Sequence, residues 1–312
     1  NNYFLISSLI AMLLSGVLNA QKDLTLEDAI LKRWTSLSPQ KLKDLKWNNE
    51  DDFFSYQSSD STIYICNYNN ELLDSISLSE MNTSLIGEDR LLKVPSITWI
   101  SRHTFRFRHN NKFYVYNIER GFQSKSLFHI KENAKSIDFN NQNEKYAYTI
   151  DNNLFVARGT DNHIQITEEN NRNIVSGQAV HRYEFGIYKG TFWSNDGSKL
   201  AFYRKDESMV TDYPLMNTSS RVGYTDVIKY PMAGMKSHHV LLGVYDFNNN
   251  KIIYLETGEP KEQYLTNIAW SPDDKYVFIA ILNRDQNHLK LNKYSAYDGK
   301  FIATLFEEKS DK

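Results

Sequence analysis

Two stretches of this 312-residue chain carry side chains that suggest catalysis or metal binding. Ser237-His238-His239 places a hydroxyl beside imidazoles, as nucleophilic catalysis needs, but neighbouring residues on a strand point to opposite faces. No Gly-x-Ser-x-Gly motif is present, so we expect no catalytic residue in these residues. Asp206-Glu207 is a weak metal signal on its own, and we expect neither a metal site nor a cofactor.

The stretch from Gly177 to Gly234 offers a candidate for binding instead. It displays an acidic residue, Glu184, on a connection between two predicted strands. A carboxylate in such a place either binds a cationic group or is a solvated surface charge paired with an arginine, such as Arg182. The residues alone leave both interpretations open.

Short predicted strands repeat along the chain and must position these residues. Each unit has an aromatic anchor, a polar turn and a β-run, and the anchors are Trp47, Trp99, Phe139, Trp193 and Trp270, spaced 52, 40, 54 and 77 residues apart. One four-stranded unit cannot bury both of its faces, so neighbouring units must stack. We predict an all-β fold, an incomplete β-propeller of about five four-stranded blades. The alternative is a β-sandwich built from similar hairpins.

Three further features give local predictions. The interval between Trp193 and Trp270 holds an insertion, residues 206–236, which we expect to extend from the rim of a blade. Thr25-Leu26-Glu27-Asp28 is a capping box, so a short helix should begin there and end near Ser36. The single cysteine, Cys66, excludes an internal disulfide and should lie buried in a strand.

Residues 1–20 have the pattern of a secretory signal peptide with a clipped start. Tyr3 to Leu14 is mostly apolar, and Ala20 offers a small residue before a cleavage point at Gln21. The alternative is a membrane anchor, but the run is shorter than the ~20 residues that span a bilayer. We expect a secreted or periplasmic protein. A net charge of −2 from 36 basic and 38 acidic residues predicts no binding of nucleic acid.

These motifs together resemble the N-terminal β-propeller domain of dipeptidyl peptidase IV-like serine peptidases, in the prolyl oligopeptidase superfamily. The resemblance covers roughly residues 24 to 306, and residues 21–312 would form the N-terminal part of that domain. Its motifs occur in the family's order: Leu24-Thr25-Leu26-Glu27-Asp28, Leu45-Lys46-Trp47, the hairpin from Tyr148 to Val156, Glu184-Phe185-Gly186, Phe192-Trp193-Ser194, Asp206-Glu207-Ser208-Met209-Val210 and Tyr230-Pro231-Met232-Ala233-Gly234.

The resemblance implies the substrate-gating domain of a secreted serine exopeptidase that releases dipeptides from peptides with a free N-terminus. The catalytic serine, aspartate and histidine would lie in a C-terminal α/β-hydrolase domain beyond Lys312, and a homodimer is a further expectation. A non-catalytic periplasmic propeller that binds a partner or acts as a scaffold is the alternative.

The resemblance also implies roles for three residues. The family binds the substrate's α-amine with a pair of glutamates, of which Arg182-Tyr183-Glu184 retains one, so Glu184 is the implied amine ligand. The family also uses an arginine from an earlier blade to contact the substrate backbone. Arg106 or Arg108 would take that role, and the alternative for each is a solvent-facing arginine on a strand.

Overall fold

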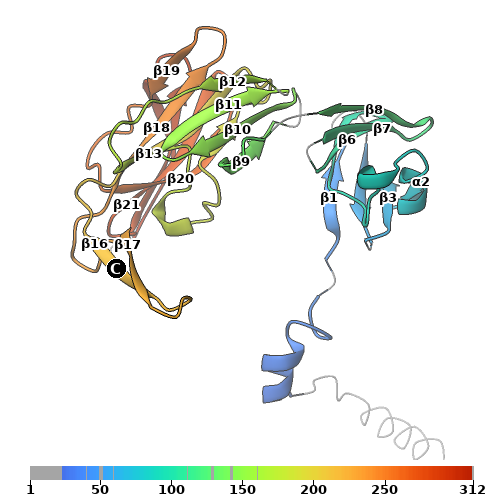
Figure 1. Ribbon diagram of the computed structural model, residues 1–312, viewed down its shortest axis with the longest axis horizontal. Coiled ribbons are helices and arrows are strands. Elements are labelled where there is room, and N and C mark those ends of the chain that lie inside the picture. Colours follow the sequence, from blue (N-terminus) through green and yellow to red (C-terminus); the bar gives the residue numbers. More distant parts are fainter. Residues whose placement is uncertain are drawn as a thin grey trace, which may run out of the picture.

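The computed structural model describes residues 23–39, 41–48, 52–58, 60–110, 112–127, 130–140, 143–159 and 161–310. Within these ranges the chain forms five successive antiparallel sheets and one separate two-stranded hairpin. Figure 1 shows the first two sheets as one group and the next three as another, joined by the connection from β8 to β9. The predicted signal peptide, residues 1–20, lies outside the described residues.

The first three sheets follow the chain in order. Their strands are β1 (Lys43–Trp47), β2 (Phe53–Gln57), β3 (Thr62–Asn67) and β4 (Leu72–Ser77), then β5 (Ile97–Ser101), β6 (Thr104–His109), β7 (Lys112–Asn117) and β8 (Gly121–Leu127), then β9 (Lys135–Phe139), β10 (Lys145–Ile150), β11 (Asn153–Arg158) and β12 (Asn162–Gln165).

The fourth sheet has a split first strand, and the fifth is again a simple meander. The fourth comprises β13 (Ile174–Ser176), β14 (Thr191–Trp193), β15 (Lys199–Asp206), β18 (His239–Asp246) and β19 (Lys251–Tyr254), and the fifth comprises β20 (Gln263–Trp270), β21 (Tyr276–Asn283), β22 (His288–Ser295) and β23 (Phe301–Lys309). The hairpin joins β16 (Asp212–Asn217) to β17 (Tyr224–Lys229). The helical segments are η2 (Asp28–Lys32), α2 (Leu78–Met81), η3 (Gly87–Asp89) and η4 (His181–Tyr183).

The predicted repeat is confirmed. All five aromatic anchors lie in the first strand of a sheet, and the five β-runs predicted to follow them form β2, β6, β10, β15 and β21. Five stacked sheets agree with a propeller of about five blades and do not fit the two-sheet sandwich.

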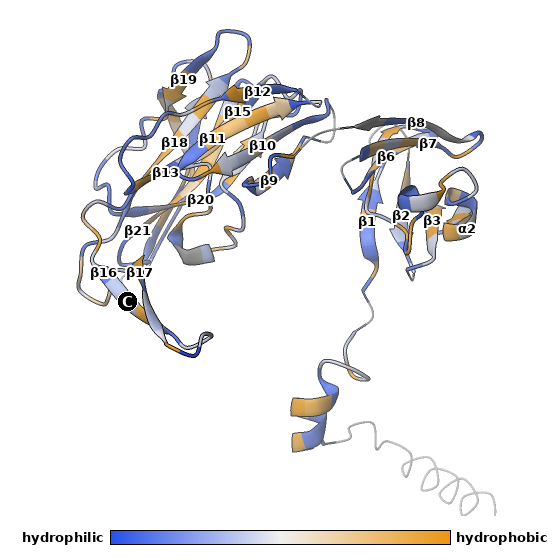
Figure 2. Cartoon of the chain, in the orientation of Figure 1, coloured by the Kyte–Doolittle hydropathy of each residue, from blue (hydrophilic) through white to orange (hydrophobic). Residues whose placement is uncertain are grey.

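A hydrophobic cluster lies between each pair of consecutive sheets, which is how each unit covers a face that it cannot bury alone. The pairs that represent these clusters, in chain order, are Ile63 with Phe105, Phe113 with Tyr146, Leu154 with Phe202, and Tyr203 with Leu265. Figure 2 shows hydrophobic residues concentrated in the strands and mostly hydrophilic residues in the loops.

Three of the tryptophan anchors also bond the sheet that precedes their own. The indole N–H of Trp99 donates to Ser55 Oγ at 2.9 Å, that of Trp193 to the Asp138 carbonyl at 3.2 Å, and that of Trp270 to the Phe192 carbonyl at 3.0 Å. The three tryptophans are half-buried, and each bond gives the polar edge of the indole a partner. The anchor therefore packs its own sheet and fixes the position of that sheet against the previous one.

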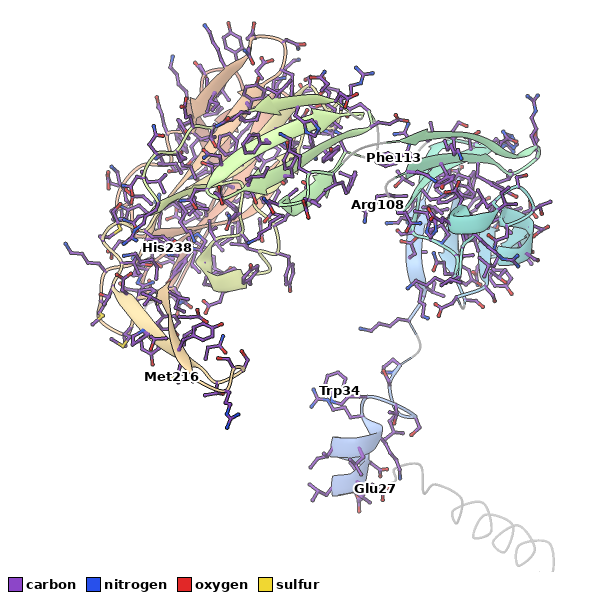
Figure 3. The ribbon with its side chains drawn as sticks, viewed as in Figure 1. Glu27, Trp34, Arg108, Phe113, Met216 and His238 are labelled. Atoms are coloured by element: carbon purple, nitrogen blue, oxygen red, sulfur yellow. The ribbon has the colours of Figure 1, made fainter. Side chains whose placement is uncertain are left out.

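Two of the local predictions are confirmed. Cys66 is a free, buried cysteine in β3. The insertion at residues 206–236 forms an extension that carries the hairpin of β16 and β17, and Figure 1 shows this hairpin projecting from the fourth sheet. Its tip bears Met216, labelled in Figure 3. No helix among the described residues is long and apolar enough to cross a membrane.

The N-terminal helix is partly as predicted. The capping box is present: Asp28 N–H donates to Thr25 Oγ1 at 3.1 Å, and Thr25 N–H donates to Asp28 Oδ2 at 3.3 Å. The end predicted near Ser36 is wrong, because the helix η2 ends at Lys32. The segment η2 is a π-helical turn, and the N–H of Leu37 donates to the Lys32 carbonyl at 2.9 Å with the same five-residue spacing.

Candidate binding site

Glu184 lies on a segment that interrupts the first strand of the fourth sheet. We call this segment, residues 177–190, the excursion. β13 and β14 flank it, and both pair antiparallel with β15. Tyr203 of β15 bonds both of its ends: the Tyr203 carbonyl accepts from Gly177 N–H at 2.8 Å, and the Tyr203 N–H donates to the Gly190 carbonyl at 3.0 Å. The excursion therefore leaves and rejoins the sheet at one residue, as a compact Ω-loop does.

Two glycines make this narrow base possible. A Cβ on Gly190 would lie 2.3 Å from the carbonyl carbon and oxygen of Gln178, which is inside the contact distance of any pair of atoms. Gly177 has a φ of +76°, and a Cβ there would lie 2.7 Å from Leu154 Cδ1. Backbone that approaches backbone this closely requires glycine. These positions are set by chain packing and do not identify a ligand.

The excursion turns its aliphatic residues and His181 inward and Glu184 outward. Val180, His181 and Ile187 are buried, whereas Glu184 is exposed. The backbone of Glu184 is held on both sides, because its N–H donates to the His181 carbonyl and its carbonyl accepts from Ile187 N–H, each at 3.0 Å. Phe185 packs against Tyr264 of β20, with ring centroids 4.8 Å apart. The fold thus holds the backbone of Glu184 in place and leaves this residue exposed to solvent.

The backbone around Glu184 is strained. Tyr183 and Phe185, its two neighbours, have φ values of +65° and +55°, and His181 has +51°. A bulky residue in this left-handed region costs about 1–3 kcal/mol and persists only where the surroundings enforce it. Strain of this kind concentrates at ligand-binding positions, so it supports a functional interpretation of Glu184.

Arg106 and Arg108 lie on β6, in the second sheet. They are two residues apart and therefore share a face of the strand. The Arg106 guanidinium carbon lies 5.8 Å from the Phe113 ring centroid, and that of Arg108 lies 4.3 Å from the Phe139 ring centroid. Partial burial lowers the pKa of Arg108. Figure 3 labels Arg108 and Phe113 where the second sheet faces the third.

These two arginines line one surface hollow of about 300 Å³. The other residues around it are Ser96, Thr98, Phe107, Phe113 and Phe139. The structure therefore brings Arg106 and Arg108 together, and Glu184 does not line this hollow. The side chain of Arg182, the predicted neighbour charge of Glu184, lies outside the described residues.

Sequence reasoning missed a pair of buried histidines beneath Glu184. His181 Nδ1 lies 3.1 Å from His238 Nε2, and His181 Nε2 accepts the backbone N–H of Leu265 at 3.2 Å. The sequence showed His238-His239 as the start of a strand, and β18 does begin at His239. Nothing in the spacing predicted the contact with His181, which is 57 residues earlier in the chain.

Comparison with known proteins places the chain in a family. The model of the dipeptidyl peptidase IV (DPP IV) N-terminal region matches residues 94–312. The chain belongs to this family. In the part of this DPP IV N-terminal region that the structure describes, no group of three or more His, Cys, Asp or Glu residues is placed to hold a metal ion.

Individual relatives agree with the family. A dipeptidyl-aminopeptidase B of Phaeosphaeria nodorum is 26% identical in an alignment of 251 positions that covers 70% of this chain and 27% of the relative. The crystal structure of a dipeptidyl aminopeptidase IV from Bacteroides ovatus is 39% identical, covers 88% of this chain and 38% of that chain, and has a TM-score of 0.68. Dipeptidyl peptidase 4 of Porphyromonas gingivalis, 20% identical with a TM-score of 0.62, shares the fold. The chain spans between a quarter and two fifths of the length of the first two proteins.

Proposed function

We propose that this chain is the substrate-gating propeller part of a serine exopeptidase that releases dipeptides from the free N-termini of peptides. Family membership supports this function over a non-catalytic scaffold, because the named relatives are dipeptidyl aminopeptidases. The catalytic serine, aspartate and histidine belong in this proposal to a C-terminal α/β-hydrolase domain of the full-length protein. In this proposal, the chain described here selects the substrate.

The observation that carries the proposal is the way Glu184 is presented. Its carboxylate is exposed on an excursion that interrupts a first strand, and its backbone is fixed by two hydrogen bonds between strained neighbours. A peptide N-terminus is cationic below its pKa of about 8. Charge-assisted hydrogen bonds between that amine and Glu184 would contribute about 1.5–3 kcal/mol, and a fixed amine determines how many residues reach the scissile bond.

The arginines of β6 are the proposed contact for the substrate backbone. Arg108 is the stronger candidate because it is an exposed residue whose guanidinium carbon lies 4.3 Å from the Phe139 ring centroid. Arg106 is less exposed and lies over Phe113. An arginine whose side chain is already ordered loses less conformational entropy when it donates to a substrate carbonyl.

Export and self-association complete the proposal. A signal peptide at residues 1–20 would direct the protein to the periplasm or outside the cell, and mass spectrometry of the mature protein should then find Gln21 at its N-terminus. A homodimer is supported by exposed apolar residues on the hairpin of β16 and β17, among them Met216 and Val227. Light scattering of the full-length protein, with and without Met216→Asp, tests this association.

The substitution Glu184→Gln in the full-length protein tests the main proposal. We expect KM for a peptide with a free N-terminus to rise roughly 10- to 100-fold, because the charge-assisted bonds are lost. KM for the same peptide with an acetylated N-terminus should change little. Glu88→Gln, at another exposed glutamate, is the matched control. Equal changes for both substrates would exclude the amine-binding role.

A further inference from the structure

The buried histidine pair links three parts of the chain that are distant in sequence. His181 belongs to η4 in the excursion, His238 precedes β18 in the same sheet, and Leu265 lies in β20 of the next sheet. Both imidazoles are almost fully buried, at 4% and 6% exposure, and their rings stack with centroids 5.0 Å apart. Figure 3 labels His238 within this second group of sheets.

The hydrogen bonds assign the protons. Because His181 Nε2 accepts from the backbone N–H of Leu265, that nitrogen carries no proton. The proton of the neutral ring is then on Nδ1, which donates to His238 Nε2 at 3.1 Å. A proton added to His181 Nε2 or to His238 Nε2 would place two hydrogen-bond donors opposite each other, and that hydrogen bond would be lost. Both histidines must therefore be neutral for the arrangement to hold.

The contact between His181 and Leu265 satisfies a backbone group at the edge of β20. Leu265 pairs with Ile281 of β21 on one side, and none of the strands that the structure describes pairs with the other side of β20. The fourth sheet satisfies both polar groups of Leu265 at that open edge: His181 accepts from its N–H, and the Tyr203 hydroxyl donates to its carbonyl at 2.7 Å. Tyr203 is also the residue that closes the base of the excursion.

Charged groups of both signs lie around the pair, and those that act on His181 are cationic. Lys205 of β15 and Arg284, which follows β21, act on His181, and Tyr264 of β20 packs its ring against it at 5.1 Å. Arg284 donates to the Tyr264 hydroxyl at 2.5 Å, and Lys205 is paired with Glu207 at 2.9 Å.

On the side of His238, the next residue His239 pairs in register with Asp206 of β15. Burial first, then electrostatic interactions with the neighbouring His238, Lys205 and Arg284, lower the pKa of His181 to about 3.

We propose that His181 and His238 are positioning residues: as a neutral, hydrogen-bonded pair they clamp the excursion to β20 and so fix Glu184 for the substrate amine. This inference rests on the proposed role of Glu184 in amine binding. His181 lies three positions before Glu184, and the carbonyl of His181 itself accepts the Glu184 N–H. A movement of the His181 backbone therefore moves Glu184 directly.

Hydrogen–deuterium exchange and steady-state kinetics of the full-length protein together test the clamp. His238→Phe keeps a ring in place but removes the acceptor for His181 Nδ1, and His238→Gln restores an acceptor that does not titrate. We expect His238→Phe to raise exchange in residues 177–190 roughly five- to tenfold and to raise KM for a free-amine peptide by a similar factor, with little change in kcat. His238→Gln should fall between His238→Phe and the unchanged protein.

Two controls separate the clamp from general destabilisation. His103→Gln removes a partly exposed histidine in the second sheet and should leave the excursion unchanged. Residues 104–117 of β6 and β7 provide an internal reference for exchange. Unchanged exchange in the excursion of His238→Phe, or an equal rise in residues 104–117, would overturn the clamp. Raised exchange confined to the excursion with an unchanged KM would confirm the clamp and overturn the role of Glu184.

Histidine NMR gives a readout that does not depend on activity. In the protein labelled with ¹⁵N at histidine, His181 should show a protonated Nδ1 and an unprotonated Nε2. It should keep this signature at pH 5, where an ordinary histidine with a pKa near 6.5 is mostly protonated. An imidazolium signature for His181 at pH 5 would contradict the neutral pair.

Discussion

The carboxylate of Asp274 accepts the backbone N–H of Asn195 at 2.8 Å, joining the fifth sheet to the turn that leaves the first strand of the fourth. It also accepts from Asn195 Nδ2 at 2.7 Å and from the Asp196 N–H at 2.9 Å. One buried side chain thus satisfies three donors of the neighbouring unit. This contact holds the fifth sheet against the fourth, from which the excursion emerges. It therefore stabilises the part of the fold that carries the excursion.

Asp274→Asn should lower the free energy of unfolding by about 1–3 kcal/mol, because the new amide group faces donors where an oxygen accepted. Asparagine tolerates the φ of +54° at this position, so the backbone is not the cause of the loss. Urea unfolding measures the effect. Asp273→Asn, at the exposed neighbour that bonds only within its own turn, is the control. Equal losses in the two variants would contradict the role given to Asp274.

Gly190→Ala should disturb the base of the excursion. The added Cβ must displace the Gln178 backbone from 2.3 Å, so we expect a loss of about 1–3 kcal/mol in the free energy of unfolding. KM for free-amine peptides should rise as well, because the excursion carries Glu184. Gly223→Ala, in the hairpin, should cost less than Gly190→Ala, because its nearest atom, the Asn217 carbonyl oxygen, is 3.2 Å away and need move by only a few tenths of an ångström. Thermal unfolding and steady-state kinetics measure the two effects. Equal results for Gly190→Ala and Gly223→Ala would show that the excursion tolerates the methyl group.

Arg108→Ala should weaken substrate binding more than Arg106→Ala. Loss of a hydrogen bond from the Arg108 guanidinium to a substrate carbonyl predicts a rise in KM of roughly 10-fold. We expect a smaller rise for Arg106→Ala, because that side chain is less exposed. Arg120→Ala, at an exposed arginine in the turn between β7 and β8, controls for the change in charge. If the KM of Arg108→Ala matched that of Arg120→Ala, the contact would have to be sought elsewhere.

The free energy of unfolding should fall in acid through His181. Above a pH of about 6.5 neither the folded nor the unfolded state binds a proton at this histidine. As the pH falls below that value the unfolded chain takes up a proton, while the folded state, with its pKa lowered to about 3 by burial and by His238, does not. Stability is therefore present above about 6.5 and is lost as the pH falls towards about 3, at up to about 1.4 kcal/mol per pH unit.

Urea unfolding at pH 7, 5.5 and 4.5 measures this dependence. The same series on His181→Gln supplies the reference, since glutamine can accept from the Leu265 N–H but does not titrate. Carboxylates contribute equally to both series, so the difference isolates the histidine. Parallel curves for the two proteins would show that His181 takes up its proton in the folded state as readily as in the unfolded one.

The repeat and its consequences were predictable from the sequence. Each anchor and the β-run after it lie within one short segment, and alternation along a strand is a local property. Trp193 and the run from Leu200 to Tyr203 therefore predicted two strands and the turn between them. The burial of Cys66 in a strand was predictable for the same reason. The end of the N-terminal helix was not predicted correctly, because no glycine or proline at residues 33–36 marks the end of η2 at Lys32.

The tertiary structure alone decided how Glu184 is held. Its excursion is closed by Tyr203 and clamped through His181 to Leu265, which is 84 residues away from His181 in the chain. Contacts of that span depend on which sheet stacks beside which, and local propensity does not encode a particular partner. The sequence predicted the carboxylate of Glu184 as a candidate ligand and the repeated strand units of the fold. The stacking of those units created the buried histidine pair and the strained backbone that present the carboxylate.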